Sequence, residues 1–463
     1  MMSGRAGRPE RAGVEEVESF LKAHPDIEAA EALVTDPTGV GRGKLLRVAD
    51  LAKMYQDGRP LPCSIMSLDI TGEDVEETGL VWDIGDADKL AWPIAGSLKR
   101  ASWMGVPTAQ LLLSLWELDG APYVADPRHV LAGVVGRLEA AGYTPVVAAE
   151  LEFYVVDPAR GADGRLQPPK TPGTGRRLDR IDVYSVIELE EFTPFIAELY
   201  ASARAMDLPA ETLISEYAPG QLEVVLRHRA NAMRAADEAI QWKRLVRGVA
   251  AKHGLVATFM AKPYSARAGS GFHIHASLAD GKGTNLFAAG DPQGTPLMRQ
   301  AIAGLLATIA DGMGVFAPNA NSYRRFQAAS YAPVARTWGV NNRSVAVRVP
   351  TGGPETRHLE HRVAGADANP YLAIATVLAG MLKGIVEKLD PGAAIEGNGY
   401  AQGSADIPTD WLAALRLLQE SAFMKETLGE RFLAIYHAIK SAECRRFNSQ
   451  VSELDLDWYL NRA

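Results

Sequence analysis

The sequence is poor in cysteine, lacks a long apolar run and has no excess of basic residues. Its two cysteines, Cys63 and Cys444, lie far apart and outside any CxxC or Cys/His pattern. Neither a disulfide framework nor a zinc knuckle is therefore expected. The protein is expected to lie in a reducing compartment. No run of roughly 18 apolar residues is present to span a membrane. Residues 1–13 include arginines but no apolar segment, unlike a signal peptide, so we expect a soluble cytoplasmic protein.

The composition is that of a globular protein with more than one core. Of the 463 residues, 47% are hydrophobic and 22% are charged, and no low-complexity tract interrupts them. This length exceeds what one hydrophobic core usually supports, which favours two or three cores. The formal net charge of −8 argues against non-specific nucleic-acid binding, which depends on a basic surface.

The order of the expected elements predicts an α+β protein with two domains. Residues 1–13 are expected to form a disordered tail. Residues 14–124 are expected to form a small N-terminal domain with one clear helix and several short strands. That helix is expected at 14–23, and strands at 27–36, 42–48 and 62–70. Asp126 followed by Pro127 is typical of a helix start, and residues 125–463 are expected to form the larger domain.

Long helices alternate with strands in the second part of the chain. A loop rich in glycine, proline and arginine is expected at 157–177, and ordered loops of this length often serve as lids or subunit contacts. Helical periodicity predicts helices at about 186–206, 230–253, 296–314, 369–388 and 410–427.

The segment VVAAELEFYVV at 146–156 predicts a β-strand with two chemically different faces. One face is entirely apolar and consists of Val147, Ala149, Leu151, Phe153 and Val155. The other places Glu150 and Glu152 two residues apart on an otherwise core-like strand. Because burying a lone carboxylate is unfavourable, this pair indicates a cationic partner. The alternative is a half-exposed strand with two solvated glutamates.

Two further segments repeat this arrangement. In EYAPGQLE at 216–223, a Pro-Gly turn between strands brings Glu216 and Glu223 near each other. In AGSGFHIHASL at 268–278, small residues allow a close backbone approach to a ligand. The strand that follows them places on one face His273, His275 and Ser277. Two histidines on one strand face suit a metal or a phosphate, with hydrogen-bonded core histidines as the alternative.

Arginines occur in the remaining charged segments. RSVAVRVP carries Arg343 and Arg348, the latter opposite three valines. LEHRV places Glu360 and Arg362 on the same strand face. Arginine favours two-pronged contacts with carboxylates and phosphates, although an isolated arginine is usually just solvated.

If these charged faces converge, they place five glutamates and a histidine beside several arginines. Oxygen-rich coordination with one imidazole suits Mg²⁺ or Mn²⁺ better than a structural zinc. Divalent ions and arginines around an acyl or phosphoryl group are typical of ATP-dependent activation chemistry.

With these motifs the chain resembles the glutamine synthetase family over nearly its whole length. The matching segments, in order, are AELEFY at 149–154, EYAPGQLE at 216–223, AGSGFHIHASL at 268–278, NSYRRF at 321–326, NNRSVAVRVP at 341–350 and LEHRVAGADANPYL at 359–372. The resemblance implies a β-grasp-like N-terminal domain and a catalytic domain whose curved antiparallel sheet forms a funnel. It also implies a double-ring homo-oligomer, usually a dodecamer of two hexameric rings, with each active site completed by a neighbouring N-terminal domain.

By matching position, the resemblance implies the roles of individual residues. Two or three divalent ions, Mg²⁺ or Mn²⁺, are expected per site. The first would be held by Glu152, Glu216 and Glu223. The second, which bridges the ATP phosphates, would be held by Glu150, His273 and Glu360. The ATP contacts implied are His275, Ser277, Arg343 and Arg348. The glutamate contacts implied are Gly269, Arg325 and Arg362.

The implied reaction is that of a glutamate–amine ligase. ATP phosphorylates the γ-carboxylate of L-glutamate, and an amine then displaces phosphate from γ-glutamyl phosphate. Positive charge is needed because a carboxylate must approach a triphosphate.

The sequence departs from the family where ammonia-using members bind ammonium. Their Tyr-Glu-Ala-Pro segment is SYAP here, so Tyr331 occupies the position of the glutamate. Asp69 matches the N-terminal ammonium aspartate, but the residues around it differ. A phenol stays neutral at pH 7 and cannot hold NH₄⁺ by charge. Tyr331 and Asp69 are therefore expected at an altered acceptor site, and together with Arg343 they are the expected catalytic residues.

The acceptor is expected to be a polyamine such as putrescine. Segments such as RRFQAASYAP and EHRVAGADANPYL look closest to the γ-glutamylpolyamine branch, which includes γ-glutamylputrescine synthetases. The acidic residues Glu73, Asp74, Glu76 and Glu77 could attract a distal ammonium, or form an ordinary solvated loop. The alternatives are ammonia, a small amine such as ethanolamine, and a catalytically inactive structural or regulatory protein. The regulatory tyrosine motif is altered around Tyr400, so nucleotidylation there is not expected.

Overall fold

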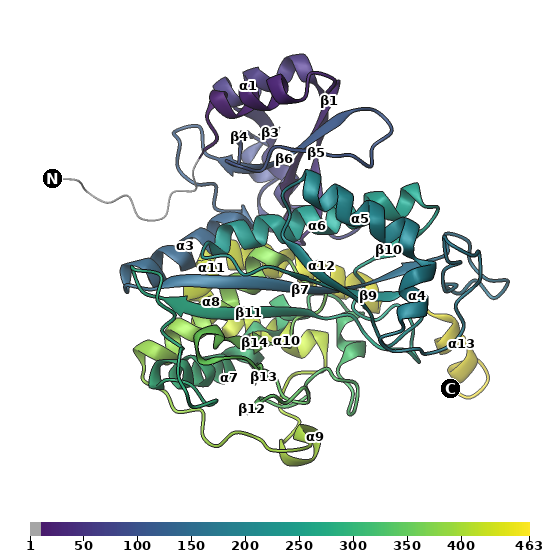
Figure 1. Cartoon of the computed structure of the whole chain (residues 1–463), viewed down its shortest axis with the longest axis vertical. Helices are drawn as coiled ribbons and strands as arrows, with labels where there is room; N and C mark the ends of the chain where they lie inside the picture. The colour runs from purple at the N-terminus through teal and green to yellow at the C-terminus, as the bar shows by residue number, and fades with distance from the viewer. Residues whose placement is uncertain (1–10) are drawn as a thin grey trace.

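Two β-sheets organise the chain, and the computed structural model describes residues 11–463 of it. The first sheet has the strand order β2-β1-β6-β4-β3, with β5 beside β6, and lies at the top of Figure 1 beneath α1. Only β1 and β6 run parallel. The strands are β1 (Ala29–Thr35), β2 (Gly41–Arg47), β3 (Arg59–Pro62), β4 (Asp88–Pro93), β5 (Lys99–Arg100) and β6 (Thr108–Trp116).

The second sheet is larger and curved. Its order is β12-β13-β14-β11-β7-β9-β8, with β10 beside β7. All pairs except β12 and β13 are antiparallel. The strands are β7 (Thr144–Val156), β8 (Ala210–Ser215), β9 (Gln221–Leu226), β10 (Val256–Thr258), β11 (Phe272–Ala279), β12 (Trp338–Val340), β13 (Val347–Val349) and β14 (Leu359–His361).

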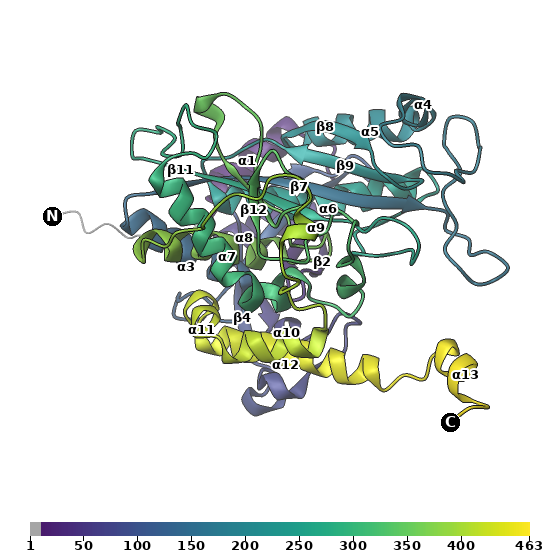
Figure 2. The ribbon, with the colours of Figure 1, turned by 90° about the horizontal axis from the view of Figure 1, so that it is seen from below.

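Helices surround both sheets, and α13 lies apart from the rest at the C-terminal end (Figure 2). The helices are α1 (Val14–Ala23), α2 (Leu51–Asp57), α3 (Pro127–Ala140), α4 (Val186–Glu191), α5 (Thr193–Ala205), α6 (Ala232–Lys252), α7 (Pro296–Phe316), α8 (Pro370–Val386), α9 (Gly399–Gln402), α10 (Trp411–Glu420), α11 (Ala422–Leu428), α12 (Glu430–Asn448) and α13 (Glu453–Tyr459).

The larger sheet has one apolar face and one polar face because side chains alternate along each strand. The predicted apolar face of β7 is buried in a core that α3, α6 and α8 complete. Figure 1 shows α6 between the two sheets. Since the helices cover the apolar face, the opposite face is left for the charged side chains of the sequence motifs.

Close backbone contact holds α7 against α8. A Cβ atom on Gly304 of α7 would lie 2.1 Å from the carbonyl oxygen of Gly380 and 2.5 Å from the nitrogen of Gly384. Glycine is required here because a side chain would separate the two helices. Since α8 also packs against β11, this contact supports the strand that carries His273.

The first sheet has its own core, to which the far end of the chain contributes. Val17 of α1 and Leu111 of β6 are buried there together with Ile435 and Ile439 of α12. Because α12 returns to the first sheet, the two parts of the chain are interlocked. The domain boundary expected near residue 124 remains a proposal.

Only the end of the expected tail, residues 11–13, lies within the described residues. Residues 1–10 lie outside the described residues. Ala12 is buried, and its N–H donates to the Pro93 carbonyl at 3.1 Å. The Arg11 guanidinium lies 4.5 Å from the ring centroid of Trp116. Arg11 and Ala12 therefore lie against the first sheet, and the expected disordered tail over 1–13 remains a proposal.

The mixed α+β class is confirmed, as are most of the predicted elements. Helix α1 has the predicted bounds, and the Asp126 side chain accepts from the Arg128 N–H at 2.9 Å at the start of α3. The helices expected at 186–206 and 410–427 are each broken into two, at Phe192 and Ser421. Helices α2, α9, α12 and α13 were not predicted, so residues 14–124 contain a second helix beside the one expected.

The prediction of a strand at 62–70 is wrong. The chain leaves β3 at Pro62 and forms a 3₁₀ helix, Cys63–Met66, followed by a turn. Local hydrogen bonds replace sheet pairing there: the Ser67 hydroxyl donates to the Ser64 carbonyl at 2.8 Å, and Asp69 accepts from the Thr71 N–H at 2.8 Å. Serine and aspartate often compete with strand formation in this way.

Two expectations from composition can be compared with the structure. Cys63 and Cys444 are both free and buried. Within residues 11–463, no helix is long and apolar enough to cross a membrane.

A buried ion pair joins three of the helices behind the larger sheet. Arg128 of α3 donates through two nitrogens to Asp237 of α6, each at 2.9 Å, and the Tyr371 hydroxyl of α8 donates to the same carboxylate at 2.7 Å. All three residues are buried. Removing one partner of such a pair leaves an uncompensated charge in the core.

We expect Asp237→Ala to lower the free energy of unfolding by about 3–5 kcal/mol, because Arg128 then stays buried without its counter-ion. Urea unfolding followed by tryptophan fluorescence measures this. The double variant Arg128→Met/Asp237→Leu should recover most of the loss, since it removes both charges. Equal destabilisation of the single and double variants would contradict the ion-pair argument.

Candidate active site

Strand register assembles charged side chains on the open face of the larger sheet. Glu150 on β7 is paired with His273 on β11, and Glu152 on β7 is paired with Glu223 on β9. Directly opposed residues on one face of an antiparallel pair lie about 5 Å apart. Strand register therefore places a metal-ligating residue directly opposite each of the two glutamates, Glu150 and Glu152.

The first of two groups contains Glu150, His273 and Glu360. The Nδ1 atom of His273 lies 2.5 Å from Glu150 Oε1 and 3.6 Å from Glu360 Oε1. The three side chains can each offer a ligand atom to a metal, and these atoms lie within 4.8 Å of one another. Burial raises the pKa of Glu150, but hydrogen bonds with His273 and His275 outweigh it and lower the pKa well below its usual value.

The second group contains Glu152, Glu223 and His273, whose ligand atoms also lie within 4.8 Å of one another. Glu152 accepts from the Gly271 N–H at 2.9 Å and from Gln221 Nε2 at 3.2 Å. Glu216 lines the same cavity but falls outside this group. The site thus holds two adjoining ligand groups that share one imidazole.

Glu216 and Glu223 are held in an unfavourable electrostatic environment. Burial, followed by the charges of Glu150 and Glu152, raises the pKa of Glu223 to about 11. Burial and the same two carboxylates raise the pKa of Glu216 to about 8. Both groups hold a proton at pH 7 unless a cation takes its place. A carboxylate-rich donor set with one imidazole fits Mg²⁺ or Mn²⁺.

Arginines neutralise the carboxylate at the other end of the site. Glu360 accepts from Arg348 at 2.7 Å and, through its other oxygen, from Arg362. Burial raises the pKa of Glu360, but the Arg362 charge outweighs it and lowers the pKa to about 2. The Nε atoms of Arg348 and Arg362 are buried, and no described residue accepts a hydrogen bond from them. These spare donors fit an anionic ligand.

Gly269 and Arg325 lie in close contact on the wall of the cavity. A Cβ atom on Gly269 would lie 2.2 Å from Arg325 Cγ and 2.7 Å from the Ala261 carbonyl oxygen. Arg325 is buried, and its NH1 donates to the Val363 carbonyl at 3.0 Å. The absence of a side chain at 269 therefore allows the guanidinium to reach the cavity.

Most of the predicted site residues line one cavity of about 400 Å³. They are Glu150, Glu152, Glu216, Glu223, Gly269, His273, Arg325, Tyr331, Arg343, Arg348, Glu360 and Arg362. Within one chain, the structure thus brings together segments that are up to about 200 residues apart.

Three predicted residues do not line this cavity. His275 and Ser277 lie further along the same face of β11 and are buried, with His275 Nε2 at 3.2 Å from Glu150 Oε2. Asp69 lines a different cavity, where Arg446 NH1 lies 3.2 Å from its carboxylate. Asp69 therefore does not reach the carboxylate groups of its own chain.

The acidic residues after Asp69 do not form a free acidic patch. Glu73 accepts from Arg446 at 2.6 Å, and Glu77 accepts from Arg445 at 2.7 Å. Because both arginines lie on α12, an unpredicted helix, the sequence around residue 73 gave no sign of these partners. The alternative of an ordinary solvated loop is the better description.

Three tyrosines lie at the rim of the cavity. The ring centroids of Tyr217 and Tyr331 are 6.3 Å apart, and Tyr184, Tyr217 and Tyr331 all line the cavity and are exposed. Tyr184 and Tyr331 have φ values of 57° and 61°, a left-handed conformation that bulky residues rarely adopt. The Tyr400 hydroxyl, which donates to the Ala332 carbonyl at 2.9 Å, holds the segment that carries Tyr331.

Several residues near the site were missed in the sequence. Gln221 could have been found, because it lies two positions before Glu223 on β9 and so shares its strand face. His228, His358, Tyr184 and Tyr217 carry no such signal. They lie outside the regular strands, where alternation does not apply.

Comparisons with known proteins agree with this geometry. The family model described as the glutamine synthetase catalytic domain matches residues 124–459. Gamma-glutamylputrescine synthetase PuuA of Escherichia coli K12 is 40% identical over 449 residues, 97% of this chain and 95% of that protein. Gamma-glutamylethanolamide synthetase GlnA4 of Streptomyces coelicolor is 32% identical over 462 residues, 99% and 97% of the two chains.

A solved structure has the same fold. The GmaS/ADP complex in conformation 1 superposes with a TM-score of 0.83 at 27% identity, covering 96% of this chain and 99% of that one. Enzymes of this family use ATP and divalent metals. From the family match and the site geometry together, the chain belongs to the glutamine synthetase family and is an ATP-dependent glutamate–amine ligase.

Proposed function

We propose that this enzyme joins the γ-carboxylate of L-glutamate to an alkyl polyamine such as putrescine. The observation that carries the proposal is the cavity rim of Tyr184, Tyr217 and Tyr331, in which Tyr331 matches the position where ammonia-using members have a glutamate. The name of its 40% identical relative, gamma-glutamylputrescine synthetase, supports the same acceptor.

The tyrosine rim is suited to an alkylamine for two physical reasons. Aromatic faces attract an organic cation by about 0.5–2 kcal/mol. They also bury the methylene groups of a diamine, at about 0.8 kcal/mol for each CH₂. Free ammonium has no methylene groups and gains only the attraction of the aromatic faces. The two tyrosines with positive φ fit this role, since strained residues cluster at ligand sites.

The roles of the charged residues follow from their positions. Glu150, His273 and Glu360 would hold one divalent ion, and Glu152, Glu216 and Glu223 another. Ions bound there offset the negative charge of a carboxylate next to a triphosphate. On this proposal Arg343 and Arg348 hold the ATP phosphates, with His275 and Ser277 along the same sheet face.

The remaining residues would orient glutamate and drive the reaction. Arg325, Arg362 and the backbone at Gly269 hold the substrate so that its γ-carboxylate oxygen attacks the terminal phosphorus, and ADP leaves. The amine nitrogen then attacks the acyl carbon of γ-glutamyl phosphate, phosphate leaves and the amine gives up a proton. Positioning of this kind lowers the barrier by converting an encounter in solution into reaction between held groups.

Asp69 has a place in this proposal only in an oligomer. In its own chain it is paired with Arg446, away from the carboxylate groups. We propose that it faces the site of a neighbouring subunit in a ring, as its matching position in the family implies.

We expect phosphate release with glutamate, ATP and Mg²⁺ to depend on the amine supplied. The kcat/KM for putrescine should exceed that for ammonia by about 100-fold or more, because methylene contacts discriminate by this amount. The panel should contain ammonia, ethanolamine, methylamine, putrescine, cadaverine and spermidine. A preference for ammonia would contradict the proposed acceptor, and a preference for ethanolamine would replace it with a small amino alcohol.

Replacing Tyr331 tests the aromatic rim directly. Tyr331→Leu should raise the KM for putrescine roughly 3- to 30-fold, as expected for loss of a cation–aromatic contact. Tyr331→Phe should remain close to wild type, since it keeps the ring and the same backbone strain. Tyr331→Glu should raise the kcat/KM for ammonia. If Tyr331→Leu and Tyr331→Phe have the same KM for putrescine, the ring of Tyr331 does not contact the acceptor.

The raised pKa values predict how stability depends on pH in the metal-free protein. Glu216 and Glu223, with pKa values of about 8 and about 11, bind protons in the folded state that the unfolded chain releases above about pH 4.5. Stability should therefore fall as pH rises from about 5 to about 8, and Mg²⁺ should restore it by replacing the protons.

Thermal unfolding with EDTA or with Mg²⁺, measured between pH 5 and 8 in roughly half-unit steps, tests this expectation. Glu223→Gln should flatten the pH dependence in EDTA, whereas the exposed-surface control Glu420→Gln should not. A metal-free protein whose midpoint rises over this pH range would contradict the electrostatic argument.

A further inference from the structure

Five of the seven charged side chains on α6 form ion pairs, and the remaining two do not. Lys243 and Arg247 pair with no acid among residues 11–463. They lie four positions apart, so they share one face of the helix, where like charges repel each other. Two neighbouring cations without a counter-ion point to an anion that the chain itself does not supply.

Lys243 lies in an environment that disfavours its charge. The side chain is buried, and its ammonium donates to the Ala368 carbonyl at 3.0 Å. An ammonium has three N–H donors, so two of them lack an acceptor among the described residues. Burial, followed by the charge of Arg247, lowers the pKa of Lys243 to about 7, and the charge of Asp367 offsets this only in part. A bound anion would stabilise the charged form.

Arg247 lies beside Lys243 on the same aromatic ring. The Arg247 guanidinium is 5.0 Å from the ring centroid of Phe259, and Lys243 Nζ is 5.5 Å from it. Arg247 is exposed, and its nitrogens make no hydrogen bond with the described residues. Its planar fork of donors is therefore free to hold a carboxylate through two hydrogen bonds.

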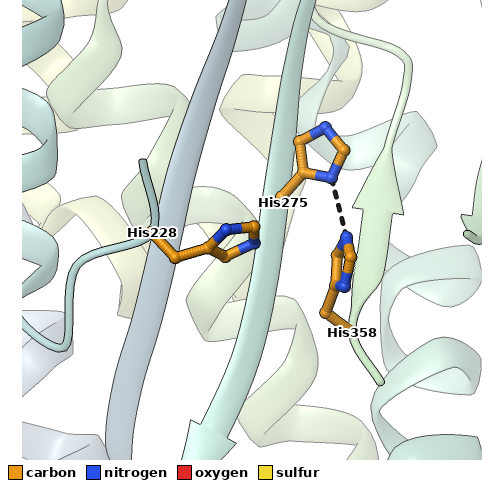
Figure 3. Close-up of side chains that lie close together, drawn as sticks. All are labelled: His228, His275 and His358. Carbon is orange, nitrogen blue, oxygen red and sulfur yellow. Dashed lines mark hydrogen bonds between the residues drawn. The ribbon is translucent and has the colours of Figure 1, made fainter. Parts of the chain in front are cut away.

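A cluster of histidines on the opposite face of the larger sheet is, by contrast, internally hydrogen-bonded. The rings of His228, His275 and His358 point toward one another (Figure 3), and the facing nitrogens of His275 and His358 share a hydrogen bond of 3.0 Å. His275 Nε2 also lies 3.2 Å from the Glu150 carboxylate. That cluster has partners of its own and adjoins the catalytic groups, whereas the two cations of α6 have no acid.

Both cations line a cavity of about 580 Å³ that is separate from the catalytic one. The two cavities share no lining residue. This second cavity is lined by the β1–β2 turn and the loop at Asp69 from the first part of the chain, and by residues of α6, α10 and α12 from the second. Binding sites for small molecules have volumes of about 300–1,000 Å³, so the cavity is large enough to hold one.

The acids that line this cavity already have donors. Asp69 is paired with α12, and Glu443 accepts from Lys440 at 2.9 Å. Asp367 accepts from the Asn319 side-chain amide at 2.8 Å. None of these three carboxylates forms an ion pair with either cation of α6. A carboxylate from outside the chain therefore has both cations available to it.

Large apolar side chains line the cavity beside the two cations. Ile70, Met260 and Phe447 are exposed there, and Phe259 and Trp411 are buried. Covering an exposed apolar side chain is favourable, at about 25 cal/mol for each Å² of apolar surface removed from water. An inorganic anion such as phosphate would leave these side chains in water, whereas an organic anion would cover them.

We propose that this cavity binds one organic carboxylate with an apolar body about the size of a phenyl ring. The carboxylate would lie between Lys243 and Arg247, and the apolar body would cover Met260 and Phe447. This site goes beyond the proposed ligase reaction, because glutamate, ATP and the amine are all assigned to the catalytic side of the sheet.

The test is isothermal titration calorimetry of the full-length protein with phenylacetate at neutral pH. One phenylacetate should bind per chain. Acetate, which lacks the ring, and benzyl alcohol, which lacks the carboxylate, should each bind at least about 10-fold more weakly. Equal or tighter binding of inorganic phosphate, or no binding of phenylacetate, would overturn the proposal.

Variants of the two cations locate the ligand. Lys243→Met and Arg247→Met should each weaken phenylacetate binding at least about 10-fold, through loss of a charge-assisted hydrogen bond. The matched control Lys252→Met, which removes a cation of the same helix that already pairs with Glu198, should bind as wild type does. Unchanged affinity in Arg247→Met, an exposed position where folding is not at risk, would overturn the proposal.

Two further measurements separate this site from the catalytic one and from unfolding. Arg343→Met removes an exposed cation from the catalytic cavity and should leave phenylacetate binding unchanged, so a loss of binding in this variant would overturn the proposal. Lys243→Met should keep or raise the thermal midpoint without ligand, because it removes a buried charge that lacks a counter-ion. The readout requires no turnover, so its failure is distinguishable from a failure of the proposed ligase reaction.

Discussion

The pairing of like charges across neighbouring strands is the constraint on which the site depends. Glu152 faces Glu223 across the β7–β9 register, an arrangement that repels at neutral pH unless a proton or a cation lies between the carboxylates. This register is stabilised because the other face of the sheet is buried in the core. A slip of one residue would turn Leu151 and Phe153, both buried, to the polar side. The core thereby holds the carboxylates in an arrangement that they would not adopt alone.

Buried charge is balanced differently at the two ends of the site. Glu360 is neutralised by Arg348 and Arg362, so its charge is balanced within the protein. Among residues 11–463, no arginine forms an ion pair with Glu216 or Glu223, and burial beside Glu150 and Glu152 raises the pKa of both. A cation is therefore favoured at one end and an anion at the other, where spare arginine donors remain. This polarity suits a reaction that brings a metal-bound triphosphate against a carboxylate.

Alternation along strands made much of this arrangement predictable from the sequence. It placed Glu150, Glu152 and His273 on polar faces opposite buried residues, and the same rule extends to Gln221. Alternation cannot predict which strands are neighbours, because register depends on contacts far apart in the sequence. It also fails outside strands, where Ser64 and Asp69 form local hydrogen bonds. The partners of the acidic loop come from α12, about 370 residues later, and no local pattern relates them.

The proposed change of acceptor is a change in how a cation is held. A carboxylate at the rim holds a small ammonium ion mainly by charge, which is effective where water is excluded. An aromatic rim gives less attraction per contact but spreads it over the length of an alkylamine. Tyr331 is exposed and lies in a strained left-handed segment that Tyr400 braces through Ala332. Selectivity would then reside in a few rim residues, while the metal and phosphate groups below them remain common to every acceptor.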